Sequence, residues 1–308
     1  MDAFRRSAWS LCLAQNCGLF STGDDDVMKS LLDVLAPAKL NLFLHVTGRR
    51  SDGYHLLQSV FMLIDWCDTL HFELRADGQI MRHDLNVPLP ADDLIVRAAR
   101  LLQSASGSRL GADISIDKQI PAQAGMGGGS SDAASTLLAL NRLWDLRLPL
   151  EKLEQLGLQL GADVPFFLRG HNAWVEGVGE QITPIKLPAA RFWVIKPPSG
   201  IETASIFRHP RLERATKPAT IAVFAADPYG FGHNDLQPVA ELLCPKVTQA
   251  IGLLKSHGLQ ARMTGSGSAV FAHCPSGNAA IQAPDHWIVR ECGNLEVHPL
   301  QGWAASDN

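Results

Sequence analysis

The sequence lacks the features that mark several common classes of protein. Its 27 Lys and Arg residues are nearly balanced by 31 Asp and Glu residues, so it has no basic excess of the kind that nucleic-acid-binding proteins carry. No apolar run reaches the roughly 18 residues that a membrane-spanning helix needs. We therefore expect a small-molecule partner, with neither nucleic acid nor a membrane as a partner.

The cysteines exclude two further kinds of site. The chain has 6 cysteines, but they are scattered and no two of them form a C-x-x-C pair. Neither a zinc site nor a disulfide framework is indicated. Unpaired thiols are typical of a reducing compartment, so we expect a cytoplasmic protein.

The chain is long enough for two domains, and segments rich in proline and glycine divide it. Its 308 residues, of which 46% are hydrophobic, can bury more than one core. Leu187-Pro188 and the Pro197–Gly200 cluster indicate a break. We expect an N-terminal extension at 1–27, a first domain at 28–187 and a second domain at 188–308.

Strand and helix patterns follow one another without strict alternation. Apolar and polar residues alternate from Leu35 to Val46, which is typical of a half-buried strand and places Lys39 and Asn41 on one face. Two further strands are predicted at 54–64 and 69–74. The mixture along the whole chain favours an α+β fold over a doubly wound α/β fold.

The glycine-rich segment Ile120–Ala134 is the most informative part of the chain. It lies between a predicted strand and a predicted helix at 132–144, and its Gly127-Gly128-Gly129 run allows backbone N–H groups to approach an anion closely. The segment therefore predicts a phosphate site. A flexible turn with a serine N-cap is the alternative that this pattern alone leaves open.

Two other nucleotide-binding motifs fit this segment less well. A Walker A loop needs a lysine, and no lysine lies between Gly125 and Asp132. A dinucleotide-binding fingerprint needs glycine where Ser130 stands, although Asp145 lies roughly 20 residues downstream, as that fingerprint requires. An oxidoreductase remains a weaker alternative.

A second glycine-rich turn occupies Met263–Phe271, between two short apolar segments. Taken alone, such a turn is more often a simple hairpin connection. Together with the first glycine-rich segment, it is a candidate for the opposite wall of a phosphate site.

Several segments together resemble those of the GHMP kinases. In chain order they are APAKLNLFL (Ala36–Leu44), DGYHLLQSVF (Asp52–Phe61), GMGGGSSDAA (Gly125–Ala134), GADVPFF (Gly161–Phe167), the Thr203 and Phe207 pair, and GSGS (Gly265–Ser268). The resemblance implies a two-domain fold, with an N-terminal domain like ribosomal protein S5 domain 2 and a ferredoxin-like C-terminal domain. The active site is then expected in the cleft between them.

The resemblance also implies a reaction. A GHMP kinase transfers the γ-phosphoryl group of ATP to an alcohol with the help of Mg²⁺, whose ligands the sequence does not assign. The first two segments are typical of members whose acceptor is the 2-hydroxyl of a cytidine-diphosphate-linked methylerythritol, in isoprenoid precursor synthesis. A GHMP kinase with another alcohol acceptor and a non-catalytic nucleotide-binding homologue remain alternatives, and the protein is expected to be a monomer or a homodimer.

Roles for individual residues follow from the same resemblance. It implies that Asp163 is the catalytic base and that Lys39 offsets the charge that develops during transfer, although spacing alone fits an ordinary turn aspartate and a solvated strand lysine. The residues expected to bind ATP are Pro121, Ala122, Gln123, Ala124, Gly125, Met126, Gly127, Gly128, Gly129, Ser130 and Ser131. Those expected to bind the acceptor are Asn41, Tyr54, His55, Thr203, Phe207, Gly265 and Ser266, with Tyr54 and Phe207 stacking on the two faces of the pyrimidine.

Overall fold

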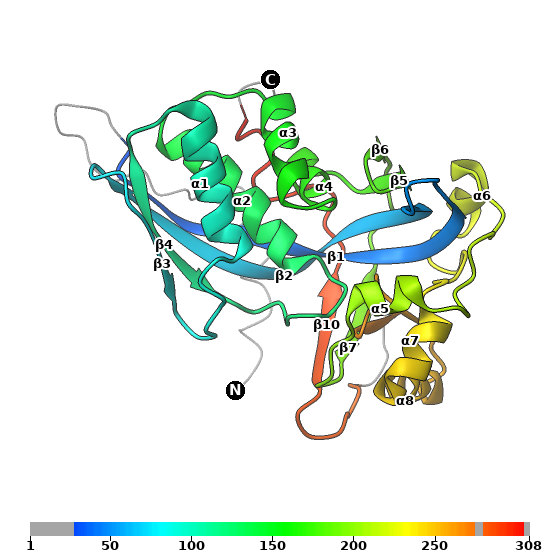
Figure 1. Ribbon diagram of the computed structural model, residues 1–308. Coiled ribbons are helices and arrows are strands. Elements are labelled where there is room, and N and C mark those ends of the chain that lie inside the picture. The colour runs from blue at the N-terminus through cyan, green and yellow to red at the C-terminus, as the bar shows by residue number, and fades with distance from the viewer. Residues whose placement is uncertain (1–27, 275–279, 305–308) are drawn as a thin grey trace.

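Two β-sheets, each with its own helices, make up the computed structural model, which describes residues 28–274 and 280–304 (Figure 1). The predicted extension at 1–27 lies outside the described residues. The first sheet has six strands, in the order β3-β4-β2-β5-β6 with β1 paired to β2. Its strands are β1 (Ser30–Arg49), β2 (His55–Arg75), β3 (Ile80–Asp84), β4 (Gly111–Asp117), β5 (Ala173–Gly177) and β6 (Gln181–Pro184).

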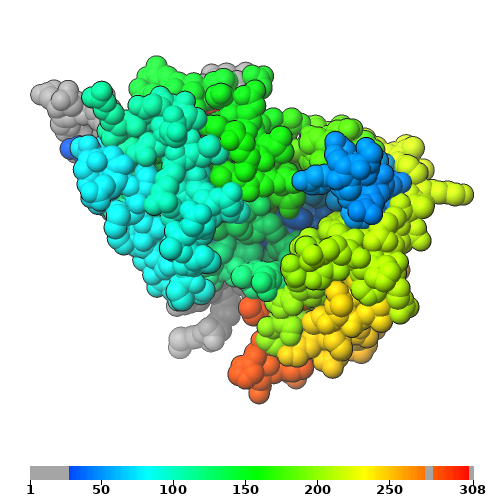
Figure 2. All heavy atoms as spheres, viewed as in Figure 1, coloured from blue at the N-terminus to red at the C-terminus, as the bar shows by residue number. Residues whose placement is uncertain are grey.

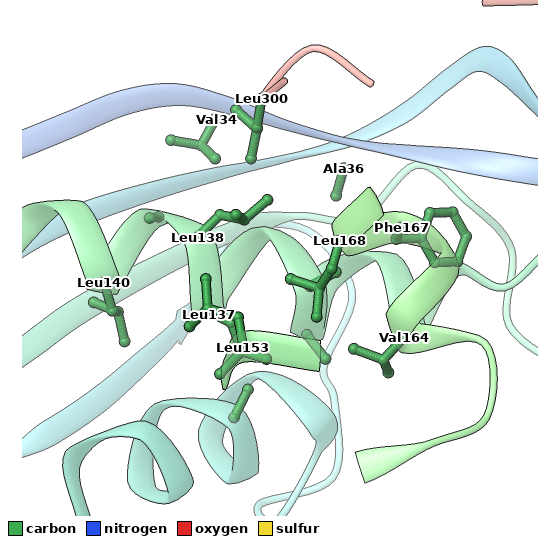
Figure 3. Packing of buried hydrophobic residues seen from close by; sticks show 14 of the residues in the cluster. Val34, Ala36, Leu137, Leu138, Leu140, Leu153, Val164, Phe167, Leu168 and Leu300 are labelled. Carbon is green, nitrogen blue, oxygen red and sulfur yellow. The ribbon is translucent and has the colours of Figure 1, made fainter. Parts of the chain in front are cut away.

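Four helices accompany this sheet and bury its apolar side chains. They are α1 (Leu94–Ser106), α2 (Gly128–Leu143), α3 (Leu150–Leu160) and α4 (Val164–Arg169). Figure 3 shows side chains of α2, α3 and α4, such as Leu137, Leu153 and Phe167, packed beneath Val34 and Ala36 of β1. The pattern of apolar residues thus fixes which side of each helix meets the sheet.

The second sheet has four strands in the order β10-β7-β9-β8, and all of its pairs are antiparallel. Numbered from its first strand, this order is the 4-1-3-2 arrangement of a ferredoxin-like domain, as predicted. Its elements are β7 (Arg191–Lys196), α5 (Thr203–Arg208), α6 (Ile221–Ala226), α7 (Gln237–Leu243), α8 (Pro245–Ser256), β8 (Ala261–Met263), β9 (Val270–His273) and β10 (Ile288–Gly293).

Strand β2 is one continuous strand and not the two strands that the sequence predicts. The polar residues in its middle are satisfied by backbone donors from elsewhere in the chain. The Asp65 carboxylate accepts a hydrogen bond from Gly293 N at 2.9 Å, and the Asp68 carboxylate accepts from Gln119 N at 2.5 Å and Ile120 N at 2.7 Å. A polar residue whose hydrogen bonds are made in this way does not interrupt a strand.

The end of the chain returns to the first sheet. After β10, Leu295 N donates to Leu63 O at 2.9 Å and His298 N donates to Gly170 O at 2.8 Å, while Leu300 joins the core beneath β1. The domain boundary at 187/188 stays a prediction, and this return means that residues beyond it pack in both halves. No helix among residues 28–274 and 280–304 is long and apolar enough to cross a membrane.

Candidate active site

The two glycine-rich turns meet at their backbones. Both Gly125 and Gly265 have a positive φ, of 72° and 53°. A Cβ atom on Gly125 would lie 2.2 Å from Thr264 O, and one on Gly265 would lie 2.7 Å from Gly125 O. Only glycine allows so close an approach, so the two turns form one surface.

Helix α2 begins directly beside this contact. Its N-cap is Gly127, which has a φ of 71° and whose hypothetical Cβ would lie 2.9 Å from the Phe167 ring. The backbone N–H groups at the start of a helix have no partners within it and carry a partial positive charge, so they attract anions. The first turn of α2, from Gly128 to Ser130, is therefore a candidate phosphate site.

The residues expected to bind ATP differ in how much of them a ligand can reach. Ala122, Gln123 and Gly129 are exposed, whereas Pro121, Gly125, Gly127, Gly128 and Ser130 are half-buried. Ala124, Met126 and Ser131 are buried, so their side chains lie in the interior of the protein. The Ser131 hydroxyl has no hydrogen-bond partner among the described residues.

Lys39, Asn41 and Asp163 lie together beside the helix start. The Lys39 ammonium donates to Asn41 Oδ1 at 2.5 Å, lies 3.6 Å from Asp163 Oδ2 and sits 4.5 Å above the centre of the Phe61 ring. The alternation that placed Lys39 and Asn41 on one face of β1 is consistent with this contact. Burial lowers the pKa of Lys39, and the negative charge of Asp163 acts in the opposite direction.

Asp163 is held by the short helix that follows it. It occupies the N-cap position of α4, with Pro165 at the start of that helix, where proline is well tolerated. Phe166 and Phe167 then anchor α4 in the core, while 32% of the Asp163 side chain stays exposed. A carboxylate is thus presented to the cavity from a rigid support.

A cavity of about 210 Å³ unites these groups. Figure 2 shows the surface hollowed between the green part of the first half and the yellow-green part of the second half. Its walls include Lys39, Asn41, Ser59, Gly125, Gly127, Asp163, Thr203, Phe207, Gly265 and Ser266. A larger cavity, of about 450 Å³, lies beside Asp65, Arg191 and His273 and contains none of the predicted site residues.

Of the residues expected to hold the acceptor, Thr203 and Phe207 line the cavity on its α5 side, whereas Tyr54 and His55 lie outside its lining. Thr203 Oγ1 and Ser266 Oγ are 2.7 Å apart and share a hydrogen bond. The Phe207 ring lies against the His55 ring, with centroids 5.0 Å apart and planes inclined by 32°. Tyr54 is 65% exposed and has no ring contact among the described residues, so the structure brings His55, and not Tyr54, to Phe207.

Sequence reasoning did not identify three polar residues of this region, which are Ser59, Thr264 and Arg214. Asn41 is fixed by Ser59, whose Oγ accepts from Asn41 Nδ2 at 2.9 Å, and by Thr264, whose Oγ1 accepts from Asn41 N at 2.9 Å. Thr264 lies in the second glycine-rich turn, directly before Gly265, and could have been suspected from that position. Ser59 and Arg214, which contacts His55, carry no local signal.

Comparison with known proteins agrees with this geometry. Family models described as "GHMP kinases N terminal domain" and "GHMP kinases C terminal" match residues 93–171 and 223–292. A 4-diphosphocytidyl-2-C-methyl-D-erythritol kinase of Albidiferax ferrireducens is 67% identical over 280 residues, which cover 91% of this chain and 98% of that protein. The chain belongs to the GHMP kinase family. It is therefore a phosphotransferase, and the family implies ATP as its phosphoryl donor.

Other relatives extend the comparison. A kinase of the same name from Polaromonas naphthalenivorans is 64% identical, covering 90% of this chain and 97% of that protein. A crystal structure of 4-(cytidine 5'-diphospho)-2C-methyl-D-erythritol kinase superposes with a TM-score of 0.69 at 33% identity, covering 84% of this chain and 98% of the other. A homoserine kinase from Cytophaga hutchinsonii, at 15% identity and a TM-score of 0.64, shares the fold. The predicted two-domain GHMP kinase fold is confirmed.

Proposed function

We propose that this chain transfers the γ-phosphoryl group of ATP to the 2-hydroxyl of 4-diphosphocytidyl-2-C-methyl-D-erythritol, giving the 2-phosphate and ADP. The observation that carries the proposal is the placement of Lys39 and Asp163 in one cavity with the start of α2 and with Phe207. A phosphate site, a carboxylate and an aromatic ring for a base are thus within reach of one ligand.

The phosphates of ATP are proposed to bind at the first turn of α2, along the segment 121–131. The N–H groups of Gly128, Gly129 and Ser130 supply donors there, and the absence of side chains at the glycines lets the phosphates approach. Gly265 of the second turn is in contact with Gly125, which supports the proposal that Gly265 and Ser266 face the same phosphates or the acceptor.

Asp163 is proposed to accept or orient the proton of the attacking hydroxyl. Phosphoryl transfer depends mostly on positioning and on neutralising charge, and the buried Lys39 supplies a positive charge beside that carboxylate. Asn41 fixes the Lys39 ammonium through its Oδ1 atom. Because Asn41 is itself held by two neighbours, the ammonium has a defined position.

Mg²⁺ is proposed to enter with the phosphates of ATP. Among the residues that the structure describes, no cluster of three or more His, Cys, Asp or Glu side chains could hold a metal ion, and Asp163 is the one carboxylate that lines the cavity. This fits Mg²⁺, which is commonly held by one or two carboxylates together with substrate phosphates and water. When bound, the ion would neutralise phosphate charge.

The cytidine is proposed to lie between Phe207 and the loop that carries Tyr54, with His55 at the edge of the base. Thr203 would approach the diphosphate or the methylerythritol. Stacking alone discriminates bases poorly, so selectivity must come from hydrogen bonds to the base edge. The reaction would serve isopentenyl diphosphate synthesis by the methylerythritol phosphate pathway, in the cytoplasm, with the enzyme a monomer or a homodimer.

The experiment is a coupled ADP-release assay with Mg-ATP and three acceptors: the cytidylated alcohol, free methylerythritol phosphate and mevalonate. We expect ADP only with the cytidylated alcohol. Equal rates with an acceptor that lacks cytidine would overturn the substrate assignment. ATP binding without ADP release from any acceptor would favour the non-catalytic alternative.

A further inference from the structure

Arg214 ties the second half of the chain to the start of β2. It lies in the segment between α5 and α6, and its Nε donates a hydrogen bond to His55 Nε2 at 3.2 Å. Figure 2 shows the loop before β2, in blue, lying against the yellow-green part of the second half. The two residues are separated by 159 positions in the chain.

The other donors of Arg214 hold the end of α5. Its Nη2 donates to Phe207 O at 3.0 Å and to His209 O at 2.8 Å, and its Nη1 donates to Leu212 O at 3.0 Å. One planar guanidinium therefore fixes both His55 and the backbone of Phe207, the two residues whose rings lie in contact. No ion pair to Arg214 occurs among the described residues, so its charge is not neutralised locally.

This contact determines which nitrogen of His55 carries the proton. An arginine donates hydrogen bonds and cannot accept them, so His55 Nε2 must be the acceptor and hence unprotonated. The proton of the neutral ring is then on Nδ1. Nδ1 has no hydrogen-bond partner among residues 28–274 and 280–304, and it is available as a donor to a ligand.

A fixed donor at this position distinguishes two pyrimidines. N3 of cytosine is an acceptor, whereas N3 of uracil carries a hydrogen and donates. A histidine with Nδ1–H pairs with the first and opposes the second. A neutral histidine that is free to change tautomer can accept from uracil N3–H instead, and so loses the distinction.

We propose that Arg214 is a positioning residue that locks His55 in the Nδ1–H tautomer and thereby makes the site select cytidine over uridine. The inference rests on the proposed function, since it assumes that the base lies beside His55. Burial and the positive charges of Arg214 and Arg49 also lower the pKa of His55, which favours the neutral ring.

The test compares Arg214→Gln with the control Arg208→Gln. Glutamine can donate or accept, so it removes the constraint on His55. Arg208 is an exposed arginine of the neighbouring helix that contacts Ala204 O and Glu202, and its substitution makes the same change in charge. The measured quantity is kcat/KM for the cytidine-linked acceptor divided by kcat/KM for its uridine-linked analogue.

We expect Arg214→Gln to lower this ratio by about tenfold, which is the effect of one hydrogen bond. The change should come from the KM for the acceptor, and the KM for ATP should stay the same. The control should keep the wild-type ratio. An unchanged ratio in a folded Arg214→Gln protein overturns the proposal, and so does an equal loss in the control.

Nitrogen NMR of the wild-type protein, with ¹⁵N-labelled histidine, tests the tautomer without turnover or a variant. We expect the His55 signals of a protonated Nδ1 and an unprotonated Nε2, and a proton on Nε2 would overturn the inference. If the wild-type protein phosphorylates no cytidylated acceptor, the proposed function fails while the NMR result still decides the tautomer.

Discussion

The two ends of the candidate active site are built differently. The transfer end consists of Lys39, Asn41 and Asp163 with the turn at 125–129. Lys39 and Asn41 are buried in β1, and the turn packs so closely on its neighbours that Gly125 and Gly127 have no space for a side chain. The base end, made of Tyr54, His55, Phe207 and Arg214, is exposed or half-buried, and Arg214 joins His55 to the backbone of Phe207. We infer that the groups of the transfer end hold their positions before the substrate binds, whereas the groups of the base end reach their final positions only around the bound cytidine.

The largest expected effect is at the transfer end, in Asp163→Asn. Removal of a group that accepts or orients a proton typically lowers the rate by about 10²–10⁴-fold. We expect a loss of that size in kcat with little change in the KM for the acceptor. Steady-state kinetics beside Asp145→Asn, a change in an exposed carboxylate paired with Arg147, would check it. A variant that retains kcat would remove Asp163 from the mechanism.

The second expected effect concerns the contact between the two turns. Gly125→Ala forces the turns apart, because the added Cβ would lie 2.2 Å from Thr264 O. A displacement of about 1 Å near the reacting groups can cost about 100-fold in rate, so we expect kcat/KM for ATP to fall by roughly that factor.

The matched control for that prediction is Gly258→Ala. Gly258 also has a positive φ, of 75°, but its Cβ would meet nothing within 4 Å. It should cost about 1 kcal/mol in the free energy of unfolding, from backbone strain, and leave kcat/KM unchanged. Equal kinetic losses in the two variants would mean that backbone strain, and not the contact, explains the effect.

The third effect belongs to the base end, in Tyr54→Ala. Stacking of a base on an aromatic ring is worth about 1–3 kcal/mol, so we expect the KM for the acceptor to rise about tenfold or more at constant kcat. Because the Tyr54 side chain is 65% exposed, urea unfolding should change by less than about 0.5 kcal/mol. Tyr54→Phe should behave like the wild type, and a KM unaffected by Tyr54→Ala would exclude stacking at this residue.

The last effect concerns the stability of the support behind α4, and no change in catalysis is expected from it. Burial lowers the pKa of His298 to about 3, below the value near 6.5 that it has when unfolded. Its stabilising contribution is therefore complete above pH 6.5 and is lost progressively as the pH falls toward 3. Between pH 7 and pH 5 the free energy of unfolding should fall by about 2 kcal/mol from this residue.

Urea titrations at pH 7 and pH 5 measure this loss. The variant His298→Gln should show a weaker pH dependence than the wild type, while His257→Gln, at the exposed end of α8, should keep the wild-type dependence. An unchanged pH dependence in His298→Gln would show that the loss comes from other groups. Activity at pH 7 should be the same in the wild type and the control.

Local patterns in the sequence account for much of the fold. The alternation along β1 put Lys39 and Asn41 on one face, and the glycine-rich segment that was expected between a strand and a helix lies between β4 and α2. The continuous β2 could not be predicted, because aspartate is unfavourable in a strand and the donors to Asp65 and Asp68 come from distant segments, Gly293 and residues 119–120.

The site was predictable to a different extent at its two ends. Resemblance supplied Lys39 and Asp163 as partners, and the structure places them 3.6 Å apart. By contrast, the contact of Arg214 with His55 joins residues 159 positions apart, and neither residue lies in a pattern that predicts the other. Contacts of this kind depend on how the two halves are placed, which periodicity within a segment does not determine.

The most direct test of the division between the two ends is calorimetric titration of the cytidylated alcohol, without ATP, into the wild-type and Asp163→Asn proteins. If the base end provides affinity and the transfer end provides chemistry, the two dissociation constants should agree within about twofold although the variant has lost turnover. A variant that loses affinity together with turnover would contradict this account, because binding would then depend on the carboxylate assigned to the chemistry alone.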